Sequence, residues 1–463
     1  MSEVGTKEAI ETTNPSTGRS LDHYEYMTKE EVIESISKCH QAFKTWKEVT
    51  PEKRAEVIKA IGIELVNAKE ELAQLMTDEM GKTLKQSRQE VDLCAAICKY
   101  TAEIGPKELK TEERDMVNGE RGRVSYAPVG VIYGIQPWNY PSYQVVRYSI
   151  ANLMAGNSVL LKHASNVTGT GKLLERIYSK AGIPAGLFTT LVISHDQSDE
   201  VIKNKLVRGV TLTGSPEAGR NIGQKATAEL KKTVLELGSN DAYLVFEDAD
   251  IDLAVKACVM GRIYNNGETC IAAKRFIVVE KVYEEFREKF VKSMREVNMG
   301  DPNNETTELG PMAREDLRDD IHEQVLKSVE RGAEIACGGK MPDGEGFYYP
   351  ATVLENVQPG QPAYEDEFFG PVASLIKAKD NEDAMRIAND SHFGLGGGIF
   401  SKDEEAAIEM AERHFDTGMV FINSFGLADP AMPFGGVKNS GYGREHGGFG
   451  LKEFVNIKSV MKR

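Results

Sequence analysis

Three separate segments of the chain carry side chains that could do chemistry together. Cys270 ends a polar stretch that begins at Asn265, and this stretch lies between a helix-like run and a strand-like run. Glu236 stands between two leucines, and Asn139 lies in a short segment bounded by prolines. Loops held between regular elements are where a scaffold places reactive groups. A thiol, a carboxylate and an amide can serve as nucleophile, general base and oxyanion donor, so these residues predict nucleophilic catalysis.

Each of these residues also has a plain structural interpretation. A lone cysteine such as Cys270 is commonly a small buried hydrophobe, and Glu236 is as readily a buried salt-bridge partner. A cysteine hydrolase would need a histidine beside the thiol, and no local signature supplies one. The residues alone therefore leave the choice open.

Short motifs in a fixed order narrow the choice, because on them the chain resembles the NAD(P)-dependent aldehyde dehydrogenase superfamily. The resemblance runs from about Asn14 to the C-terminus. The stretch from Lys162 to Asn166 is most similar to the shorter bacterial succinate-semialdehyde dehydrogenases. In chain order, the motifs are P-W-N-Y-P at 137–141, Lys162 in L-K-H, T-G-S at 213–215, L-E-L-G at 235–238, G-x-x-C ending at Cys270, E-F-F-G-P-V at 367–372 and P-F-G-G at 433–436.

The resemblance implies a role for each catalytic candidate. Cys270 attacks the aldehyde, and the resulting oxyanion is stabilised by Asn139 and by the backbone N–H of Cys270. Glu236 activates the water that hydrolyses the thioester, and Glu445 matches a second carboxylate that relays protons in some members. The family often has glutamine where this chain has Glu268, whose charge would raise the pKa of the thiol if it lay close to it.

The phosphate-binding segment lacks the G-x-G-x-x-G pattern of many dinucleotide folds. Instead, Val210 to Gly219 is a strand that runs into a glycine, a capping serine and a first-turn proline. This arrangement predicts either an ordinary capped helix or free N–H groups that bind pyrophosphate. The resemblance implies the second, with contacts from Gly214 and Ser215, and it also places Trp138 and Leu237 at the cofactor.

The ribose contacts indicate which dinucleotide is used. Lys162 ends an apolar strand and emerges at the edge where open α/β sheets bind ligands, and the resemblance implies that it touches the adenosine ribose. Many NAD-preferring members carry a glutamate where this chain has Ser165. A hydroxyl does not repel a 2′-phosphate as a carboxylate does, so NADP is favoured over NAD. The resemblance also implies that Glu367 holds the nicotinamide ribose beside the ring of Phe369.

Arg147 is the clue to the substrate. It is the only charged residue between Val124 and Leu161, and it shares a predicted helix face with Tyr143. An isolated guanidinium in apolar surroundings needs a carboxylate from the protein or from a ligand. In the similar succinate-semialdehyde dehydrogenases an arginine at this place binds the distal carboxylate, but Ala428 replaces a serine that assists there.

The elements that must hold these groups alternate between helix-like and strand-like stretches, which predicts a doubly wound, mostly parallel sheet. The first unit has expected helices Lys29 to Trp46, Pro51 to Met80, Tyr143 to Met154, Gly169 to Ala181 and Gln197 to Asn204, and strands Ser158 to Lys162, Thr189 to Ile193 and Gly209 to Thr213, with Arg123 to Ile135 a strand or hairpin. A second unit begins near Lys232, with strands Asp241 to Phe246 and Phe276 to Val279, helices Asp252 to Tyr264, Tyr283 to Glu296 and Asp316 to Arg331, and a loop from Gly338 to Tyr349.

The resemblance implies an α/β fold made of a Rossmann-like cofactor domain, an α/β catalytic domain and a small β oligomerisation arm. The cofactor-binding domain is expected at 1–112 and 127–231, the catalytic domain at 232–423, and the arm at 113–126 and 447–463. Residues 424–446 return to the cofactor domain and the rim of the active site. A homodimer or homotetramer follows, because such an arm pairs with a neighbour's sheet edge.

Composition excludes several other classes. A chain of 463 residues is expected to form two or three domains, and its net charge of −15 disfavours nucleic acid and anionic membranes as partners. The segment Met1 to Glu8 has no apolar core like that of a signal peptide, and no apolar run could span a bilayer. Six scattered cysteines predict free thiols in the cytoplasm and no metal site, with Cys94 and Cys98 as packing residues.

Two alternative functions remain for comparison. In one, the protein is a broad aliphatic aldehyde dehydrogenase in which Arg147 is structural. In the other, it is a binding or structural protein that keeps the fold without turnover. The presence of Cys270, Glu236 and Asn139 together favours an enzyme.

Overall fold

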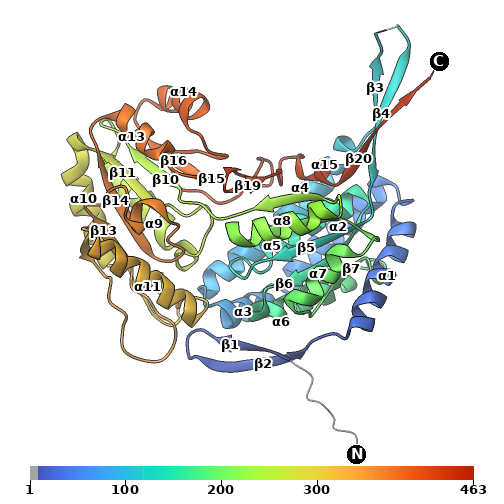
Figure 1. Cartoon of the computed structure of the whole chain (residues 1–463), viewed down its shortest axis with the longest axis horizontal. Helices are drawn as coiled ribbons and strands as arrows, with labels where there is room; N and C mark the ends of the chain where they lie inside the picture. Colours follow the sequence, from blue (N-terminus) through green and yellow to red (C-terminus); the bar gives the residue numbers. More distant parts are fainter. Residues whose placement is uncertain (1–8, 118, 463) are drawn as a thin grey trace, which may run out of the picture.

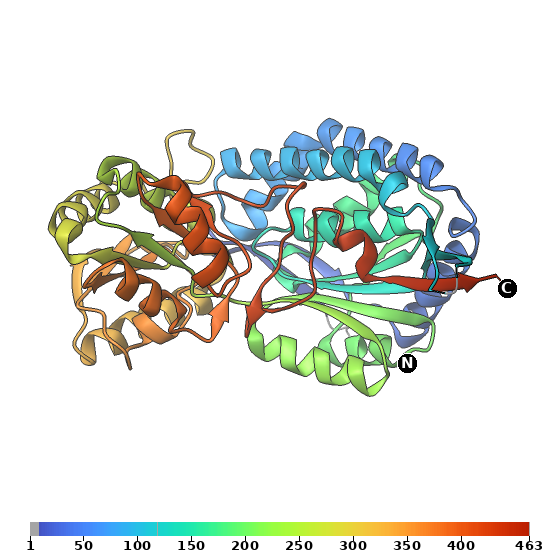
Figure 2. The same cartoon turned by 90° about the horizontal axis from the view of Figure 1, so that it is seen from above.

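Two α/β lobes lie side by side in the computed structural model, and a β arm projects from one of them (Figures 1 and 2). The structure describes residues 9–117 and 119–462. The segment Met1 to Glu8, for which the sequence predicts no signal peptide, lies outside the described residues, as do Asn118 and Arg463. A hairpin of β1 (Ala9–Asn14) and β2 (Arg19–Glu25) precedes the first lobe.

The first lobe is built on a six-stranded sheet in the order β19-β9-β8-β5-β6-β7. Its strands are parallel except β19, which runs antiparallel to β9. The strands are β5 (Val131–Gln136), β6 (Ser158–His163), β7 (Phe188–Thr190), β8 (Val207–Thr213), β9 (Lys232–Glu236) and β19 (Gly441–Tyr442). The helices between them are α5 (Tyr143–Ala155), η1 (Ser165–Val167), α6 (Thr168–Lys180), α7 (His195–Lys203) and α8 (Pro216–Ala228). The predicted parallel sheet is confirmed.

The four N-terminal helices lie on both faces of this sheet: the first packs on the sheet beside α7 and α8, and the other three cover α5 and α6 on the opposite face (Figure 2). They are α1 (Lys29–Trp46), α2 (Pro51–Asn67), α3 (Lys69–Met80) and α4 (Leu84–Glu108). The hydroxyl of Thr50 caps α2 by accepting from the N–H of Lys53, as its place before a first-turn proline predicts. The stretch predicted as one helix, Pro51 to Met80, is broken at Ala68, and α4 is an element that the sequence analysis did not identify.

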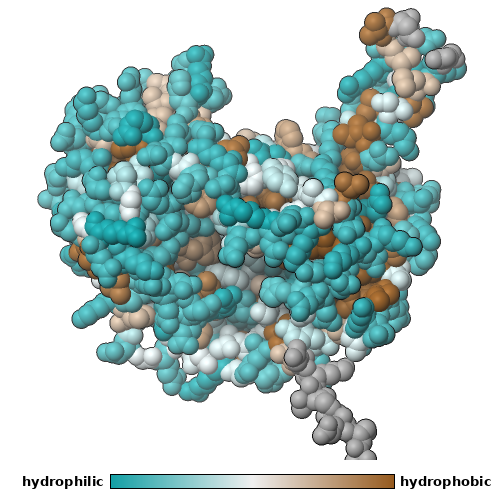
Figure 3. Space-filling model, in the orientation of Figure 1, coloured by the Kyte–Doolittle hydropathy of each residue, from teal (hydrophilic) through white to brown (hydrophobic). Residues whose placement is uncertain are grey.

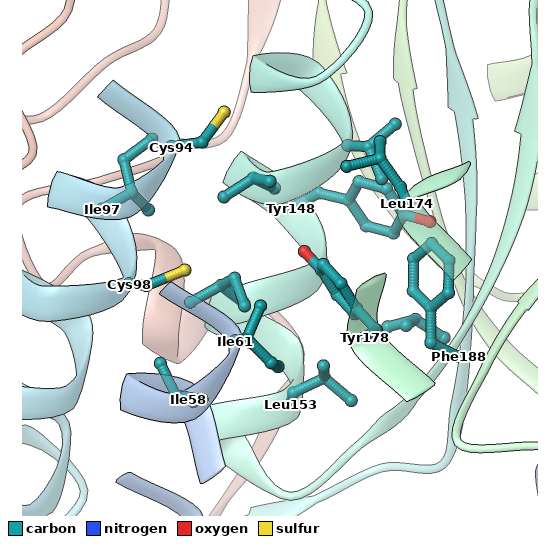
Figure 4. Close-up of a cluster of buried hydrophobic side chains, with 14 of the residues drawn as sticks. Ile58, Ile61, Cys94, Ile97, Cys98, Tyr148, Leu153, Leu174, Tyr178 and Phe188 are labelled. Atoms are coloured by element: carbon teal, nitrogen blue, oxygen red, sulfur yellow. The ribbon is translucent and has the colours of Figure 1, made fainter. Parts of the chain in front are cut away.

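The core of the first lobe forms where α2, α4, α5 and α6 meet (Figure 4). Cys94 and Cys98 project from one face of α4 into this cluster, and both are fully buried. Their thiols lie among aliphatic and aromatic side chains such as Ile61 and Tyr178. The prediction that the two cysteines are packing residues is confirmed.

The second lobe is built on a seven-stranded sheet in the order β12-β13-β14-β11-β10-β16-β17. Only β12 runs antiparallel to its neighbour. The strands are β10 (Ala242–Val245), β11 (Arg275–Val279), β12 (Glu334–Cys337), β13 (Thr352–Glu355), β14 (Val372–Ala378), β16 (Gly397–Phe400) and β17 (Phe421–Ile422). The helices are α9 (Ile251–Ile263), η2 (Tyr264–Gly267), α10 (Glu280–Arg295), α11 (Glu315–Glu330), α12 (Pro362–Glu365), α13 (Asn381–Asn389) and α14 (Glu404–His414).

The arm is a three-stranded antiparallel sheet in the order β20-β4-β3. It combines β3 (Glu112–Asp115) and β4 (Arg121–Pro128) with β20 (Val455–Met461), which follows the short helix α15 (Gly450–Glu453). A small pair, β15 (Phe393–Gly394) and β18 (Val437–Lys438), joins the returning chain to the second lobe.

Two predictions about the first lobe are wrong in part. The second unit was predicted to begin near Lys232, but Lys232–Glu236 forms β9, which pairs with β8 in the first sheet, so the second sheet starts at β10. The stretch Arg123 to Ile135 is neither one strand nor a hairpin, because β4 belongs to the arm and β5 to the six-stranded sheet. In both cases the sequence did not show the sheet to which a strand belongs, because apolar residues do not specify the partner of a strand. The remaining domain boundaries stay a prediction.

Candidate active site

Asn139 lies in the turn between β5 and α5, and its side chain is held by the loop that carries the thiol. Its Nδ2 donates to the backbone carbonyl of Glu268 at 3.0 Å, and the backbone carbonyl of Asn139 accepts from Nδ2 of Asn265 at 2.9 Å. A carboxamide has two N–H donors, so one remains after the bond to Glu268. The predicted oxyanion donor is therefore positioned next to the Cys270 loop.

A buried ion pair fixes the start of α5. The ammonium of Lys82 pairs with the carboxylate of Glu90, and both side chains are almost fully buried. The Oε1 atom of Glu90 also accepts from the backbone N–H groups of Ser142 and Tyr143, at 2.8 Å each. A carboxylate at a helix N-terminus satisfies unpaired N–H groups and is favoured by the helix dipole.

The Cys270 loop has an unusual backbone. Asn265, Asn266 and Gly267 all have positive φ angles, of 55°, 58° and 75°. Asparagine and glycine are the residues that adopt this region most readily. A Cβ atom on Gly267 would lie 2.4 Å from the backbone carbon of Gly370. The residue types in this polar stretch are thus required by the conformation that presents Cys270.

The Cys270 side chain is partly buried. Burial raises the pKa of its thiol to about 12, while the positive charges of Arg147 and Lys274 act in the opposite direction and Glu367 adds to the increase. The thiol is therefore protonated at neutral pH in this state. A thiolate is the attacking form, so the proton must leave before a carbonyl can be attacked.

Glu236 ends β9 and is almost fully buried. Among the described residues, neither of its carboxylate oxygens has a hydrogen-bond partner. Burial raises the pKa of this carboxyl group well above its usual range; Arg147 opposes the shift and Glu445 adds to it. A buried carboxylate without a partner and with a raised pKa suits a general base that works near neutrality.

Glu445 supplies the carboxylate that the Arg147 guanidinium needs. The two side chains form an ion pair, although the contact lacks the geometry of a hydrogen bond. Arg147 also donates to the hydroxyls of Tyr143, at 3.4 Å, and Thr213, at 3.0 Å. Its guanidinium carbon lies 4.6 Å from the centre of the Phe434 ring. The alternative in which the protein itself neutralises Arg147 is thus confirmed, and a contact with substrate stays a prediction.

A small cavity of about 20 Å³ adjoins Cys270. Of the described residues that line it, none carries a charge. Its walls include Tyr140, Tyr143, Gln144, Leu427, Ala428 and Phe434. The sequence analysis singled out Ala428 as the place of a missing serine, and the structure places that residue in the wall. Arg147 is not part of the lining and contacts Tyr143 and Phe434 from behind.

The predicted nicotinamide-ribose residues also lie near the thiol. Glu367 accepts from the backbone N–H of Ser239 at 3.0 Å and forms an ion pair of 3.1 Å with Lys274. The ring of Phe369 meets that of Trp138 edge-on, with their centres 5.7 Å apart. Lys274 further donates to the carbonyl of Cys270 at 2.6 Å, so it ties Glu367 to the catalytic loop.

A second cavity, of about 190 Å³, lies at the carboxyl ends of β6 and β7. Lys162, Ser165 and Arg314 are among its lining residues, and no described residue in the lining is acidic. Burial lowers the pKa of the Lys162 ammonium. A polar cavity with two cationic side chains and no carboxylate fits a ribose that carries a phosphate. Lys162 and Ser165 are thus brought together as predicted.

The turn between β8 and α8 holds the predicted pyrophosphate residues. The hydroxyl of Ser215 caps α8 by accepting from the N–H of Ala218 at 3.2 Å. The N–H of Gly214 is not free, because it donates to the carbonyl of Glu236 at 3.0 Å. The N–H of Leu237 likewise donates to the carbonyl of Ser440. The capped helix start is confirmed, and the contact of Gly214 and Ser215 with a pyrophosphate stays a prediction, in which the bonded N–H of Gly214 is not a free donor.

Glu268 is fully buried and its carboxylate accepts from the N–H of Ala313 at 3.0 Å. Burial raises the pKa of this group well above its usual range. The side chain is thus anchored toward the segment before α11. Its backbone carbonyl, by contrast, faces Asn139.

Three residues that position the site, Lys274, Lys82 and Glu90, were missed by the sequence analysis. Lys274 follows an apolar run after Cys270 and precedes Arg275, and two cationic residues at the entrance of a buried strand are a signal that could have identified it. The pair of Lys82 and Glu90 gives no such signal, because both residues lie in an ordinary charged helical region. Within the described part of the chain, no group of three or more acidic, histidine or cysteine side chains could hold a metal ion.

No helix in residues 9–117 or 119–462 is both long enough and apolar enough to cross a bilayer. All six cysteines are free.

Comparisons with known proteins agree with the geometry. A model of the aldehyde dehydrogenase family matches residues 2–460. A succinate semialdehyde dehydrogenase of Escherichia coli, named as using NAD(P)+, is 45% identical over 97% of both chains. A succinate-semialdehyde dehydrogenase of Deinococcus radiodurans, named as using NADP+, is 40% identical over 97% of this chain and 94% of the relative. The crystal structure of a succinic semialdehyde dehydrogenase from Streptococcus pyogenes with NADP+ superimposes with a TM-score of 0.96, 36% identity and coverage of 98% and 100%.

Proposed function

Because the chain belongs to the aldehyde dehydrogenase family, we propose that it oxidises succinate semialdehyde, or a similar short ω-carboxylated aldehyde, to the acid with NADP or NAD, NADP being favoured. The observation that supports the reaction type is that Asn139 bonds to the Cys270 loop, while Arg147 acts on the pKa of both Cys270 and Glu236, whose carboxylate has no partner among the described residues. The named substrates and cofactors of the relatives support the choice of aldehyde and dinucleotide.

The chain's own residues account for the covalent steps. The Cys270 sulfur, once deprotonated, forms a bond to the carbonyl carbon, and the oxygen becomes an oxyanion that accepts from Asn139 Nδ2 and the Cys270 N–H. A dinucleotide bound beside this carbon would supply the acceptor for the hydride that leaves it. Glu236 then takes a proton from water as the water attacks the thioester, which releases the acid and returns the thiolate. Glu445, held by two backbone hydrogen bonds to Phe434, is available to pass that proton on.

The dinucleotide would be held along the edge of the first sheet. Lys162 and Ser165 would hold the adenosine ribose and its 2′-phosphate, and Glu367 the nicotinamide ribose beside Phe369. The absence of acidic side chains from the described lining of the larger cavity supports NADP.

One observation favours the second candidate, a broad aliphatic aldehyde dehydrogenase. The described lining of the Cys270 cavity is uncharged, and Arg147 already has a carboxylate partner. An assay of the purified protein with succinate semialdehyde and butanal, each with NADP and NAD, separates the two. A kcat/KM at least about tenfold higher for succinate semialdehyde is expected, and equal values for the two aldehydes would favour the second candidate.

The protein is further proposed to be a cytoplasmic homodimer or homotetramer. Figure 3 shows hydrophobic residues on the projecting arm, and Ile457, Val460 and Met461 on β20 are 49–72% exposed. Apolar side chains on an open strand edge are normally covered by another chain. The free cysteines support a reducing compartment. Sedimentation at micromolar concentration tests the assembly, and a monomer would contradict it.

A further inference from the structure

Gln144 combines deep burial with an unpaired polar group. It lies in the first turn of α5 and is 1% exposed. Among the residues that the structure describes, neither its Nε2 nor its Oε1 has a hydrogen-bond partner. Leaving a buried amide unpaired is unfavourable, so such a group in a folded protein calls for a specific explanation.

The side chain lines the cavity that adjoins Cys270. The other polar groups of that lining are already engaged. The hydroxyl of Tyr140 lies 2.9 Å from that of Thr269, and the hydroxyl of Tyr143 lies 3.1 Å from Nε2 of His446. The carboxamide of Gln144 is therefore the polar side chain of this wall that has capacity for a ligand.

Arg147 does not duplicate this function. Its charge is neutralised by Glu445, and its contacts with Tyr143 and Phe434 place it behind the cavity wall. A ligand carboxylate that paired with Arg147 would have to compete with Glu445. An amide N–H can donate to the same carboxylate without breaking an ion pair.

We propose that the carboxamide of Gln144 binds the polar end of the aldehyde, opposite the carbonyl, and selects ω-polar aldehydes over alkanals. The inference deepens the proposed function and rests on it for the choice of substrate. The Nε2 group donates to an ω-carboxylate, and the Oε1 atom can accept from an ω-hydroxyl. The chemistry at Cys270 is unchanged, so Gln144 affects specificity and not the reaction type.

The test replaces Gln144 by methionine, which has a similar length and shape but no amide. The kcat/KM for succinate semialdehyde is expected to fall by roughly 10- to 150-fold relative to that for butanal, the loss expected for a hydrogen bond to a charged group. Gln136→Met is the matched control, because Gln136 is 3% exposed with an unpaired amide but does not line the Cys270 cavity. In this control variant, kcat/KM should change by the same factor for succinate semialdehyde and for butanal.

A second variant reverses the charge preference. Gln144→Glu places a carboxylate in the cavity, which repels succinate semialdehyde and attracts 4-aminobutanal. The ratio of kcat/KM for 4-aminobutanal to that for succinate semialdehyde should rise by at least about tenfold. NADP binding, followed by fluorescence, verifies that each variant is folded.

The outcomes separate this inference from the proposed function. If the wild type does not prefer succinate semialdehyde to butanal, the proposed function fails, and 4-hydroxybutanal against butanal then tests Gln144 in the same variants. A selective loss for the ω-polar aldehyde in Gln144→Met supports the inference. An equal loss for both aldehydes, or no loss, overturns it, and so does an unchanged charge preference in Gln144→Glu.

Discussion

The two cavities of the active site are built in opposite ways. The larger, about 190 Å³, lies at strand ends of the first sheet and has the cationic residues Lys162 and Arg314 in its lining. The smaller, about 20 Å³, adjoins Cys270, and its described lining is uncharged. The first offers charge for a charged group of the cofactor, whereas the second offers shape and a single unpaired amide. Recognition of cofactor and of substrate should therefore be separable by mutation.

The largest effect is expected for Cys270→Ala. Without the thiol no covalent bond to the aldehyde forms, so activity should fall below about 1% of wild type. NADP binding should remain within a few-fold, because the cofactor cavity does not use the thiol. Binding is measured by calorimetry and turnover by NADPH absorbance. Substantial turnover would contradict the role of Cys270 as nucleophile. Loss of NADP binding would show that the cofactor and substrate sites cannot be changed independently.

Glu236→Gln should slow hydrolysis of the thioester by about 100- to 10,000-fold while leaving its formation possible. Stopped-flow measurement of NADPH should then show a burst of about one equivalent per active site, followed by a slow steady state. The glutamine retains the size of the side chain and the pairing of β9. A steady state at the wild-type rate without a burst would move the base to Glu445 or Glu268.

Arg147→Met tests whether the charge behind the cavity wall reaches the substrate. A direct contact with the substrate carboxylate predicts that kcat/KM for succinate semialdehyde falls roughly 10- to 150-fold more than that for butanal, whereas selection by Gln144 alone predicts an equal fall for both aldehydes. The single change leaves the buried carboxylate of Glu445 without its ion-pair partner. The double variant Arg147→Met/Glu445→Gln is therefore the control. If both aldehydes are affected equally in the single and double variants, Arg147 is structural, and selection of the ω-carboxylate is left to Gln144.

Ser165→Glu should shift preference from NADP toward NAD by about tenfold, or ~1.4 kcal/mol, since the new carboxylate repels a 2′-phosphate. Ser165→Ala, which removes the hydroxyl without adding charge, should give a smaller shift. The ratio of kcat/KM for the two cofactors is the measurement. Equal ratios in wild type and Ser165→Glu would show that this position does not contact the phosphate.

The smallest effect is expected for Glu445→Gln on the pH profile. Glu445 raises the pKa of Glu236, so its removal should lower that pKa. The base works only when deprotonated, and activity is lost as pH falls through its pKa. The acidic limb of kcat should therefore move to lower pH by less than about one unit. An unchanged acidic limb would show that Glu445 does not act on the base, and a shift toward higher pH would contradict the direction of its effect.

Much of the fold and the catalytic set could be predicted from the sequence, because motifs and periodicity are local. The strands around Lys162 and Thr213 and the helix beginning at Tyr143 were recognised in this way. The sheet to which a strand belongs was harder to predict, because apolar residues do not specify the strand with which they pair. Residues 232–236 were assigned to the second unit but form β9 in the first sheet. The neutralisation of Arg147 could not be predicted, since Glu445 lies far along the chain and only the folded structure brings them together.

The pairing of β9 with β19 has a consequence for when the enzyme becomes complete. Glu236 lies opposite Gly441, so the general base is carried by a strand whose outer neighbour comes from the last part of the chain. Glu445 follows in the same segment. A ribosome will have synthesised both central sheets, and the thiol loop between them, before this segment emerges. A protein cut short before residue 441 can thus present a thiol but not the surroundings of its base, so synthesis itself delays the onset of turnover.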